Sequence, residues 1–168
     1  MDLSSLIGGG VRPYLEYGWV CAPNGAAQTL TANTVNTLSC DTRVSDFYGF
    51  GAINPTTNTL SLSAGTYLYE AHATIRPSGG VDGRVGFIVG LWNNTSSTWI
   101  SRIAASSLYN YYPVPLRGQF TIDAITQLRL QALIDAGQTC VVQSGYTPFT
   151  NSTFGNDQRT AIKLWKLA

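Results

Sequence analysis

The sequence predicts an all-β fold, namely a β-sandwich of about eight to ten short strands. Apolar and polar residues alternate with a period of two over most segments, whereas the period of an amphipathic helix is nearly absent. The composition agrees with strands, because it combines 17 Gly and 9 Tyr with abundant Thr, Ser and Asn. With 168 residues, of which 44% are hydrophobic, the chain is long enough for one domain with a substantial core.

Four strands are expected in the first half of the chain, at residues 14–20, 34–38, 60–63 and 66–75. The first two alternate only briefly and are therefore weaker signals. The last two alternate strictly and are separated by Ala64 and Gly65, a pair that favours a tight turn. Between the two pairs, an aromatic segment at residues 47–50 contains a glycine, which is typical of a bulge or a bend.

Six further strands are expected at residues 84–92, 98–104, 116–122, 127–134, 140–143 and 160–167. The polar segment 93–97 joins the first two of them as a hairpin turn. Pro113 and Pro115 exclude the segment before residue 116 from a central position in a sheet, because proline has no N–H to donate. In the last strand, we expect both lysines, Lys163 and Lys166, on one solvent-facing side.

Charged residues are scarce in this chain. They make up 11% of it, the formal net charge is +1 and the sequence pI is about 7.7, whereas soluble domains usually contain roughly 25% charged residues. The chain therefore lacks the basic footprint of proteins that bind nucleic acid or anionic membranes, and we expect neither as a partner. A surface with so little charge is poorly suited to staying monomeric, so the composition favours burial in an assembly.

Residues 1–13 stand apart from the domain, which we place at residues 14–168. Leu3, Leu6 and Ile7 form a small apolar group, and three consecutive glycines follow them as a flexible hinge. We interpret this arm as an anchor that attaches the domain to a larger particle. The arm has no basic start, and its apolar run is too short for a secretory signal, so we expect the protein to be made in a host cytoplasm.

No catalytic residue, cofactor or metal site is expected. The single histidine, His72, lies between two alanines in an expected strand, which favours a structural role. The 9 acidic residues are scattered singly, mostly at strand ends and turns, which is unlike the paired carboxylates of a glycoside hydrolase. The three cysteines, Cys21, Cys40 and Cys140, are widely spaced and odd in number, which favours reduced, buried side chains over disulfides or zinc ligands.

The order of strand motifs from Phe47 onward resembles the complement component 1q globular head and tumour necrosis factor superfamily. The similar motifs are GTYLYEA at residues 65–71, GQFTI at 118–122, QLRLQ at 127–131 and AIKLW at 161–165. The resemblance implies a jelly roll of about ten strands whose inner sheet packs around a three-fold axis, with aromatic side chains buried along that axis. The best aromatic candidates for such a trimer interface are Phe47, Tyr48, Tyr69, Tyr109, Tyr111 and Tyr112.

Two aromatic segments invite a functional interpretation. Residues 107–113 combine tyrosines with an asparagine, which suits either a subunit interface or stacking on sugar rings or nucleobases. We favour the interface, because the basic residues that would hold phosphates are missing. Residues 147–155 are polar with two phenylalanines and are the better candidate for an outward contact, through Phe149, Asn151 and Phe154.

Domains that look like this, without secretion signals and rich in Thr, Asn and Gly, also occur in tailed-phage virions. We therefore expect a non-enzymatic virion structural protein, a homotrimeric capsid decoration or head-fibre module. Its partners would be further copies of itself and a capsid or other virion protein. The alternative is the receptor-binding tip of a tail fibre or spike that recognises a host cell-surface saccharide. A third interpretation, a hydrolase on a jelly roll, would require a carboxylate pair.

Overall fold

The computed structural model describes residues 14–21, 27–40, 42–47, 49–79, 84–108, 112–136, 139–142 and 157–167. Strands occupy most of these ranges, and no helix occurs in them. That part of the chain accordingly contains no helix long and apolar enough to cross a membrane. The all-β class predicted from the sequence is confirmed.

The strands are β1 (Tyr14–Cys21), β2 (Gln28–Leu30), β3 (Val35–Thr37), β4 (Thr42–Phe47), β5 (Gly51–Asn54), β6 (Thr59–Leu62), β7 (Gly65–Gly79), β8 (Arg84–Asn93), β9 (Thr98–Leu108), β10 (Tyr112–Ile122), β11 (Thr126–Ile134), β12 (Thr139–Val142) and β13 (Asp157–Lys166). Three of them, β2, β4 and β5, have no counterpart among the expected strands. They are only three to six residues long, so they contain too few alternations to stand out in the sequence.

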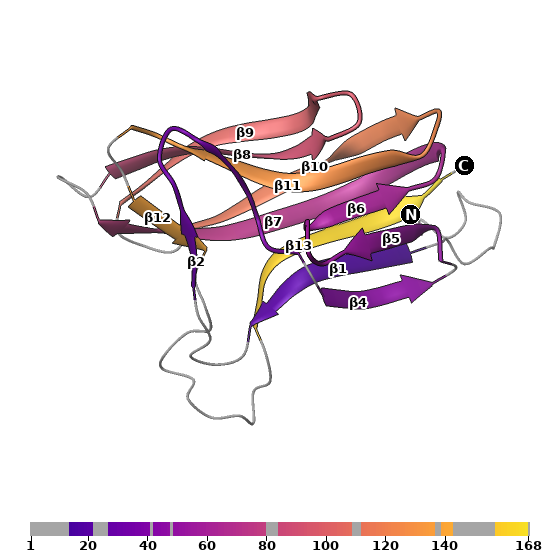
Figure 1. Ribbon diagram of the computed structural model, residues 1–168, viewed down its shortest axis with the longest axis horizontal. Helices are drawn as coiled ribbons and strands as arrows, with labels where there is room; N and C mark the ends of the chain where they lie inside the picture. Colours follow the sequence, from indigo (N-terminus) through magenta and orange to yellow (C-terminus); the bar gives the residue numbers. More distant parts are fainter. Residues whose placement is uncertain are drawn as a thin grey trace, which may run out of the picture.

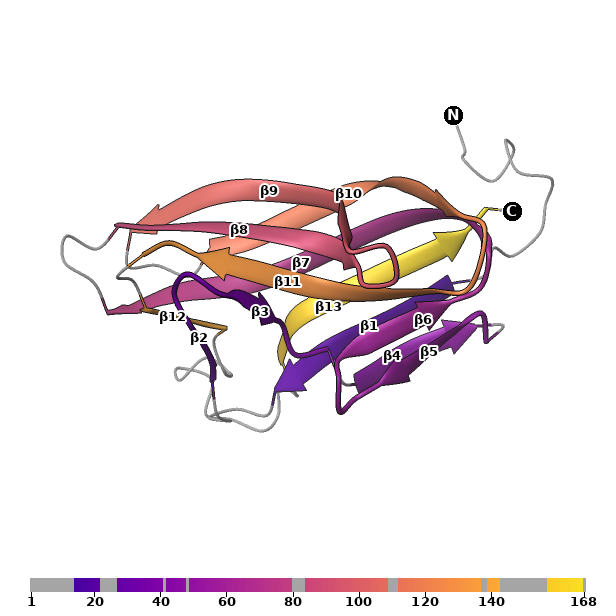
Figure 2. The same ribbon diagram turned by 45° about the horizontal axis from the view of Figure 1, so that its top comes forward.

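Two sheets stack face to face, as Figures 1 and 2 show. The seven-stranded sheet has the order β2-β12-β7-β13-β1-β4, and β10 pairs with the long strand β7 as well. The six-stranded sheet has the order β5-β6-β11-β8-β9, and β3 pairs with β11. Every pairing between these strands is antiparallel. Non-consecutive strands such as β7, β13 and β1 lie side by side, which makes the fold a jelly roll rather than a simple meander.

Strand β10 begins earlier than expected, at Tyr112 rather than at residue 116, and so includes Pro113 and Pro115. Within the described part of the chain, β10 pairs with β7 alone, so it is an edge strand. An edge strand tolerates proline because half of its N–H groups need no partner. The expectation that these prolines avoid a central position holds, but they do not end the strand.

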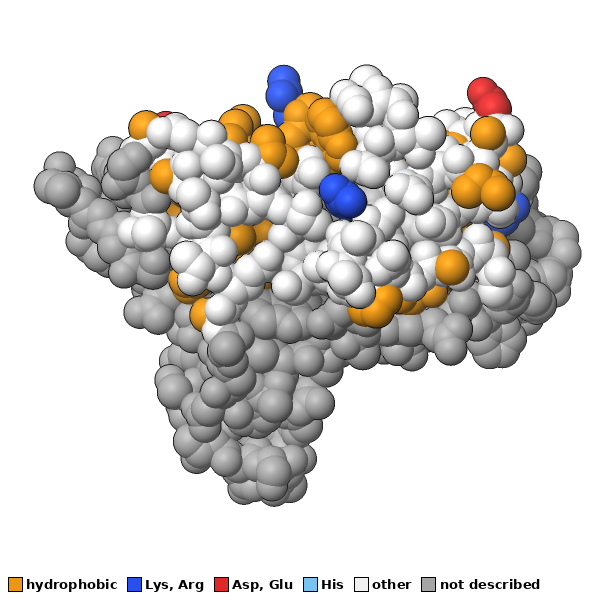
Figure 3. Space-filling model, in the orientation of Figure 1, with side chains coloured by type: hydrophobic (Ala, Val, Ile, Leu, Met, Phe, Trp, Pro, Cys, Tyr) orange, Lys and Arg blue, Asp and Glu red, His pale blue; other side chains and the backbone are white. Residues whose placement is uncertain are grey.

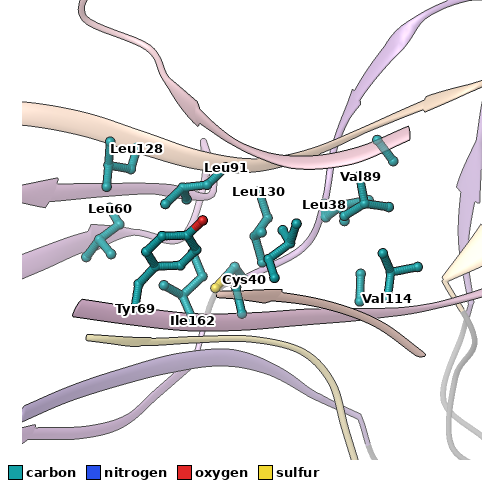
Figure 4. Close-up of a cluster of buried hydrophobic side chains, with 14 of the residues drawn as sticks. Leu38, Cys40, Leu60, Tyr69, Val89, Leu91, Val114, Leu128, Leu130 and Ile162 are labelled. Carbon is teal, nitrogen blue, oxygen red and sulfur yellow. The ribbon is translucent and has the colours of Figure 1, made fainter. Parts of the chain in front are cut away.

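The core lies between the two sheets and is built from the inward residues of both. Figure 4 shows Leu91, Leu128 and Leu130 on one side facing Val114 and Ile162 on the other. All five are at most 1% exposed. Full burial of one such side chain contributes about 1.5–3 kcal/mol, so the core is the main source of stability.

Two cysteines belong to this core. Neither Cys40 nor Cys140 forms a disulfide and both are buried, as predicted from the number and spacing of the cysteines. Desolvation by burial raises the pKa of Cys140 to about 11, so its thiol stays protonated and unreactive near neutral pH. The side chain of Cys21 lies outside the described residues.

Candidate functional site

The outer face of the seven-stranded sheet carries an apolar row that crosses several strands. Tyr14 of β1 pairs with Trp165 of β13, and Trp165 pairs with Leu68 of β7. The rings of Tyr14 and Trp165 are 5.3 Å apart between centroids, and both side chains are partly exposed. Leu68 is 41% exposed. An apolar row on the solvent side of a sheet differs from the polar outer face that an antiparallel sheet in water usually shows.

A row of alternating charges crosses the same strands next to the apolar row. Glu16 of β1 lies 3.7 Å from the ammonium group of Lys163 on β13, which pairs in register with Glu70 of β7. Glu70 lies 3.7 Å from the guanidinium of Arg117 on β10. Such exposed pairs contribute only about 0–1 kcal/mol to the stability of one subunit. The row therefore contributes more to the pattern of the surface than to its stability.

Tyr14 links the two rows. Its hydroxyl donates a hydrogen bond to Oε2 of Glu16. Desolvation by burial, with the hydrogen bond and the charge of Glu16 adding to it, raises the pKa of Tyr14 well above its ordinary value. The hydroxyl therefore stays protonated and orients the Glu16 carboxylate at every physiological pH.

His72 lies in the next row of this face, where it pairs with Ala161 of β13 and Pro115 of β10. A depression of about 120 Å³ is lined here by His72 together with Glu70, Ala71, Pro115, Leu116, Arg117 and Lys163. Among the described residues, its lining includes no serine, threonine or cysteine. Among these lining residues, His72 therefore has no hydroxyl or thiol that it could activate as a base.

Tyr69 corrects one part of the predicted trimer interface. It is 2% exposed, and its hydroxyl donates a hydrogen bond to Ser101 of the opposite sheet. Figure 4 shows its ring pointing across the core toward that sheet. Leu68 and Glu70, the neighbours of Tyr69 along β7, are both exposed. Successive side chains of a strand point to opposite faces, so Tyr69 points inward. Tyr69 is therefore a core residue and offers no surface to a neighbouring subunit.

The remaining predicted site residues cannot be placed as side chains. Phe47 and Tyr112 have their backbone in β4 and β10, but their side chains lie outside the described residues. The other interface candidates, the anchoring residues and the outward-contact residues also lie outside the described ranges; they are Tyr48, Tyr109 and Tyr111, then Leu3, Leu6 and Ile7, and finally Phe149, Asn151 and Phe154.

The two ends of β1 nevertheless show where residues 1–13 and the segment 143–156 join the domain. Tyr14 begins β1 and pairs with Trp165 near the end of β13, so residues 1–13 join at that end of the sheet. Cys21 ends β1 and pairs with Asp157, the first residue of β13, at the opposite end of both strands. The segment 143–156 leads into Asp157, so it joins the domain at the end far from the arm.

The two lysines of β13 lie on opposite faces, contrary to the sequence prediction. Lys163 is on the outer face with Glu16, whereas Lys166 donates a hydrogen bond to Ser63 and lies 5.8 Å from the ring centroid of Tyr67. Their separation of three residues is an odd number, which in a strand places side chains on opposite faces. The alternation of side chains along β13 places Trp165 on the same face as Lys163. Applied to the sequence, this alternation would have predicted part of the apolar row.

Comparison with known proteins identifies the fold. No family model matches the chain, and no curated protein matches it. Among solved structures, murine APRIL at pH 8.0 superimposes with a TM-score of 0.58 at 12% identity, covering 94% of this chain and 100% of that chain. The Eiger TNF structure from S. frugiperda gives a TM-score of 0.58 at 12% identity, covering 94% of each chain. The fold is therefore a TNF-like jelly roll, as the resemblance of the strand motifs implied.

Proposed function

We propose that the protein is a non-enzymatic structural component of a tailed-phage virion. In this proposal it is a homotrimeric capsid-decoration or head-fibre module, held on a larger shell by residues 1–13. The observation that carries the proposal is the outer face of the seven-stranded sheet, where an apolar row lies beside a row of alternating charges. Exposed apolar groups framed by polar ones are typical of surfaces that a partner covers.

The pattern of this face favours a second copy of the same chain as the partner. Among the described side chains, the charged row consists of two carboxylates, Glu16 and Glu70, and two cations, Lys163 and Arg117, so the row has no net charge. Neighbouring copies can therefore oppose unlike charges while the apolar rows come into contact. A three-fold arrangement, which the resemblance to the tumour necrosis factor superfamily implies, closes on itself and leaves no copy with an uncovered face.

The points at which residues 1–13 and the segment 143–156 join the domain support an anchor at one end of the domain and an exposed surface at the opposite end. Residues 1–13 join the domain at the Tyr14 end of β1, and the segment 143–156 joins at the Cys21 end. In a parallel trimer, three arms leave together at one end. Three weak attachments then act as one multivalent anchor, which is far tighter than a single arm. In this proposal, the end of the domain at which the segment 143–156 joins is the end away from the shell.

The virion setting is supported by composition. A chain with 11% charged residues and a net charge of +1 has little charge repulsion to keep it soluble as a monomer. A subunit fixed on a particle needs less of this repulsion, because neighbouring subunits cover part of its surface.

Immunogold labelling of purified virions of the source phage tests the proposal. We expect antibodies against the full chain to label the particles at regular positions. Antigen found only in the soluble fraction of the lysate, with unlabelled particles, would contradict the proposal.

The anchor is tested in the same particles with a variant that replaces Leu3, Leu6 and Ile7 by glutamine. We expect this variant to remain trimeric but to be lost from the virions. A matched variant with Ser4→Ala and Ser5→Ala changes the same segment without removing its apolar side chains, and it should remain attached. Retention of both variants would show that the arm is not the anchor.

A further inference from the structure

The outer face of the six-stranded sheet carries a tryptophan pair that the proposed function does not use. Trp92 of β8 and Trp99 of β9 are cross-strand partners, with ring centroids 5.0 Å apart and planes inclined at 76°. Both side chains are partly exposed. Gly90 lies beside them on β8, and a Cβ at that position would be 2.6 Å from Cε3 of Trp99. The indole of Trp99 therefore lies across Gly90, in space that any side chain would fill.

Two arginines flank this pair. Arg129 of β11 is the cross-strand partner of Trp92, and Arg102 of β9 is the partner of Gly90. Directly paired residues point to the same side of a sheet, so both guanidiniums lie on the face that carries the tryptophans. The Nε–H of Arg129 donates to Oγ1 of Thr59 at 3.0 Å, and Arg102 is exposed. Figure 3 shows hydrophobic side chains close to cationic ones on one face of the molecule.

Neither arginine has a carboxylate partner within the described ranges, where the ion pairs involve Arg117 and Lys163 on the other sheet. Gln131 of β11 is the cross-strand partner of Gly90 and is 7% exposed. Its Oε1 accepts no hydrogen bond from any described residue. A buried acceptor without a donor is costly for the folded protein. Among its described residues, this face therefore combines two cations without a carboxylate partner, a buried acceptor without a hydrogen-bond donor, and exposed aromatic surface.

We propose that this face binds an oligosaccharide that carries a carboxylate. The indoles offer flat apolar surface to the C–H side of a sugar ring, and a guanidinium binds a carboxylate through two parallel hydrogen bonds. A nucleic acid fits less well, because the described side chains of the patch include only two cations and the whole chain has a net charge of +1. The acidic sugar is either a terminal sialic acid or an internal uronate, since both present the same group.

The proposed saccharide site is independent of the self-association surface. It lies on the six-stranded sheet, whereas the apolar and charged rows lie on the seven-stranded sheet. Assembly through the latter leaves the tryptophan face exposed to solvent in every copy. It also differs from the aromatic segments 107–113 and 147–155, which the sequence offered for sugar contacts.

Titration of the full chain with sialyllactose, a hyaluronan tetrasaccharide and lactose, followed by calorimetry and tryptophan fluorescence, tests the proposal. We expect binding in the millimolar range for at least one of the two acidic oligosaccharides, and weaker binding for neutral lactose. The acidic oligosaccharide that binds more tightly identifies the source of the carboxylate. No binding of either acidic oligosaccharide at concentrations about tenfold above the expected millimolar Kd would overturn the proposal. The affinity would then be more than about 1.4 kcal/mol weaker than expected.

Variants assign the binding to this face. Arg102→Gln removes an exposed cation without affecting the core, and we expect it to weaken binding of the acidic sugar about tenfold while leaving lactose unchanged. Lys166→Gln is the control: it removes a cation that lies beside Ser63 and belongs neither to this face nor to the apolar and charged rows, so it should bind like the wild-type protein. Equal affinities for all three proteins, or a loss that follows Lys166 instead, would place the sugar elsewhere and overturn the proposal. Tighter binding of single-stranded DNA than of either acidic sugar would also overturn it.

Discussion

The substitution Gly90→Ala is predicted to destabilise the protein, because this position has no room for a methyl group. A Cβ at residue 90 would lie 2.5 Å from the carbonyl oxygen of Ser101 and 2.6 Å from the Trp99 ring. The first of these atoms is backbone of the neighbouring strand, so the clash cannot be relieved by a side-chain rotation alone. Either the β8–β9 pairing must shift or the Trp99 indole must leave its place.

The magnitude follows from the cost of overpacking. Inserting a methyl group into a filled site typically costs about 1–3 kcal/mol. In a domain of this size, about 1 kcal/mol corresponds to about 2–4 °C in Tm. We therefore expect the Tm of the Gly90→Ala protein to fall by about 2–12 °C.

Gly86→Ala is the matched control, because Gly86 lies on the same strand and has room for the change. Its nearest contact is Oδ2 of Asp135 at 3.3 Å, the end of an exposed side chain that can move. Replacing a glycine in an unstrained strand restricts the unfolded chain, which stabilises by about 0.4–1 kcal/mol. Thermal unfolding at one fixed protein concentration, followed by tryptophan fluorescence, measures the Tm of both variants. Equal Tm values of the two variants would refute the placement of the Trp99 indole over Gly90.

Three further predictions concern the core, the buried thiol and the association surface. Leu130 is fully buried, so Leu130→Ala should lower the free energy of unfolding by about 2–5 kcal/mol in urea titrations; a loss below 1 kcal/mol would contradict the packing. Burial raises the pKa of Cys140 from 9.0 to about 11, so the folded state disfavours the thiolate, and stability that is complete below pH 9 should decline as the pH rises toward 11. That decline should be reduced in Cys140→Ala, and an identical pH dependence would refute its origin in this thiol. Leu68→Glu should weaken self-association at least about tenfold by placing a charge in the apolar row, whereas Ile125→Glu, at a 75% exposed position in the turn between β10 and β11, should not; equal masses of the two variants would contradict the role of Leu68.

The long strands were predictable because each contains enough residues to show which side faces inward. Residues 127–132 alternate between polar and apolar, and the structure gives β11 with Leu128 and Leu130 buried. The short strand β5 could not be found in this way, because its four residues take their place from pairing with β6 rather than from their own pattern. Local alternation thus reports strands that carry much of the core and misses those that complete a sheet edge.

The candidate site was less predictable than the fold. The apolar row joins Tyr14, Leu68 and Trp165, which are far apart in the sequence and become neighbours only through the register of β1, β13 and β7. Register is a property of strand pairs and cannot be read from one strand. Choosing interface residues by aromatic type alone selected Tyr69, although the alternation along β7 already placed it opposite Leu68 and Glu70.

The tryptophan face depends on pairing in the same way. Trp92 and Trp99 flank the expected turn at residues 93–97, so a hairpin predicts their proximity. The contribution of Gly90 and the two arginines appears only when β11, β8 and β9 are placed in register.

The mass of the full chain in solution at micromolar concentration is the most direct test of self-association. Sedimentation equilibrium in mild buffer should give about three times the 18.1 kDa of one chain, because the apolar and charged rows of the seven-stranded sheet are covered by neighbouring copies. A mass of 18.1 kDa under the same conditions would mean that this face stays in water, and the trimeric module proposed here would not exist.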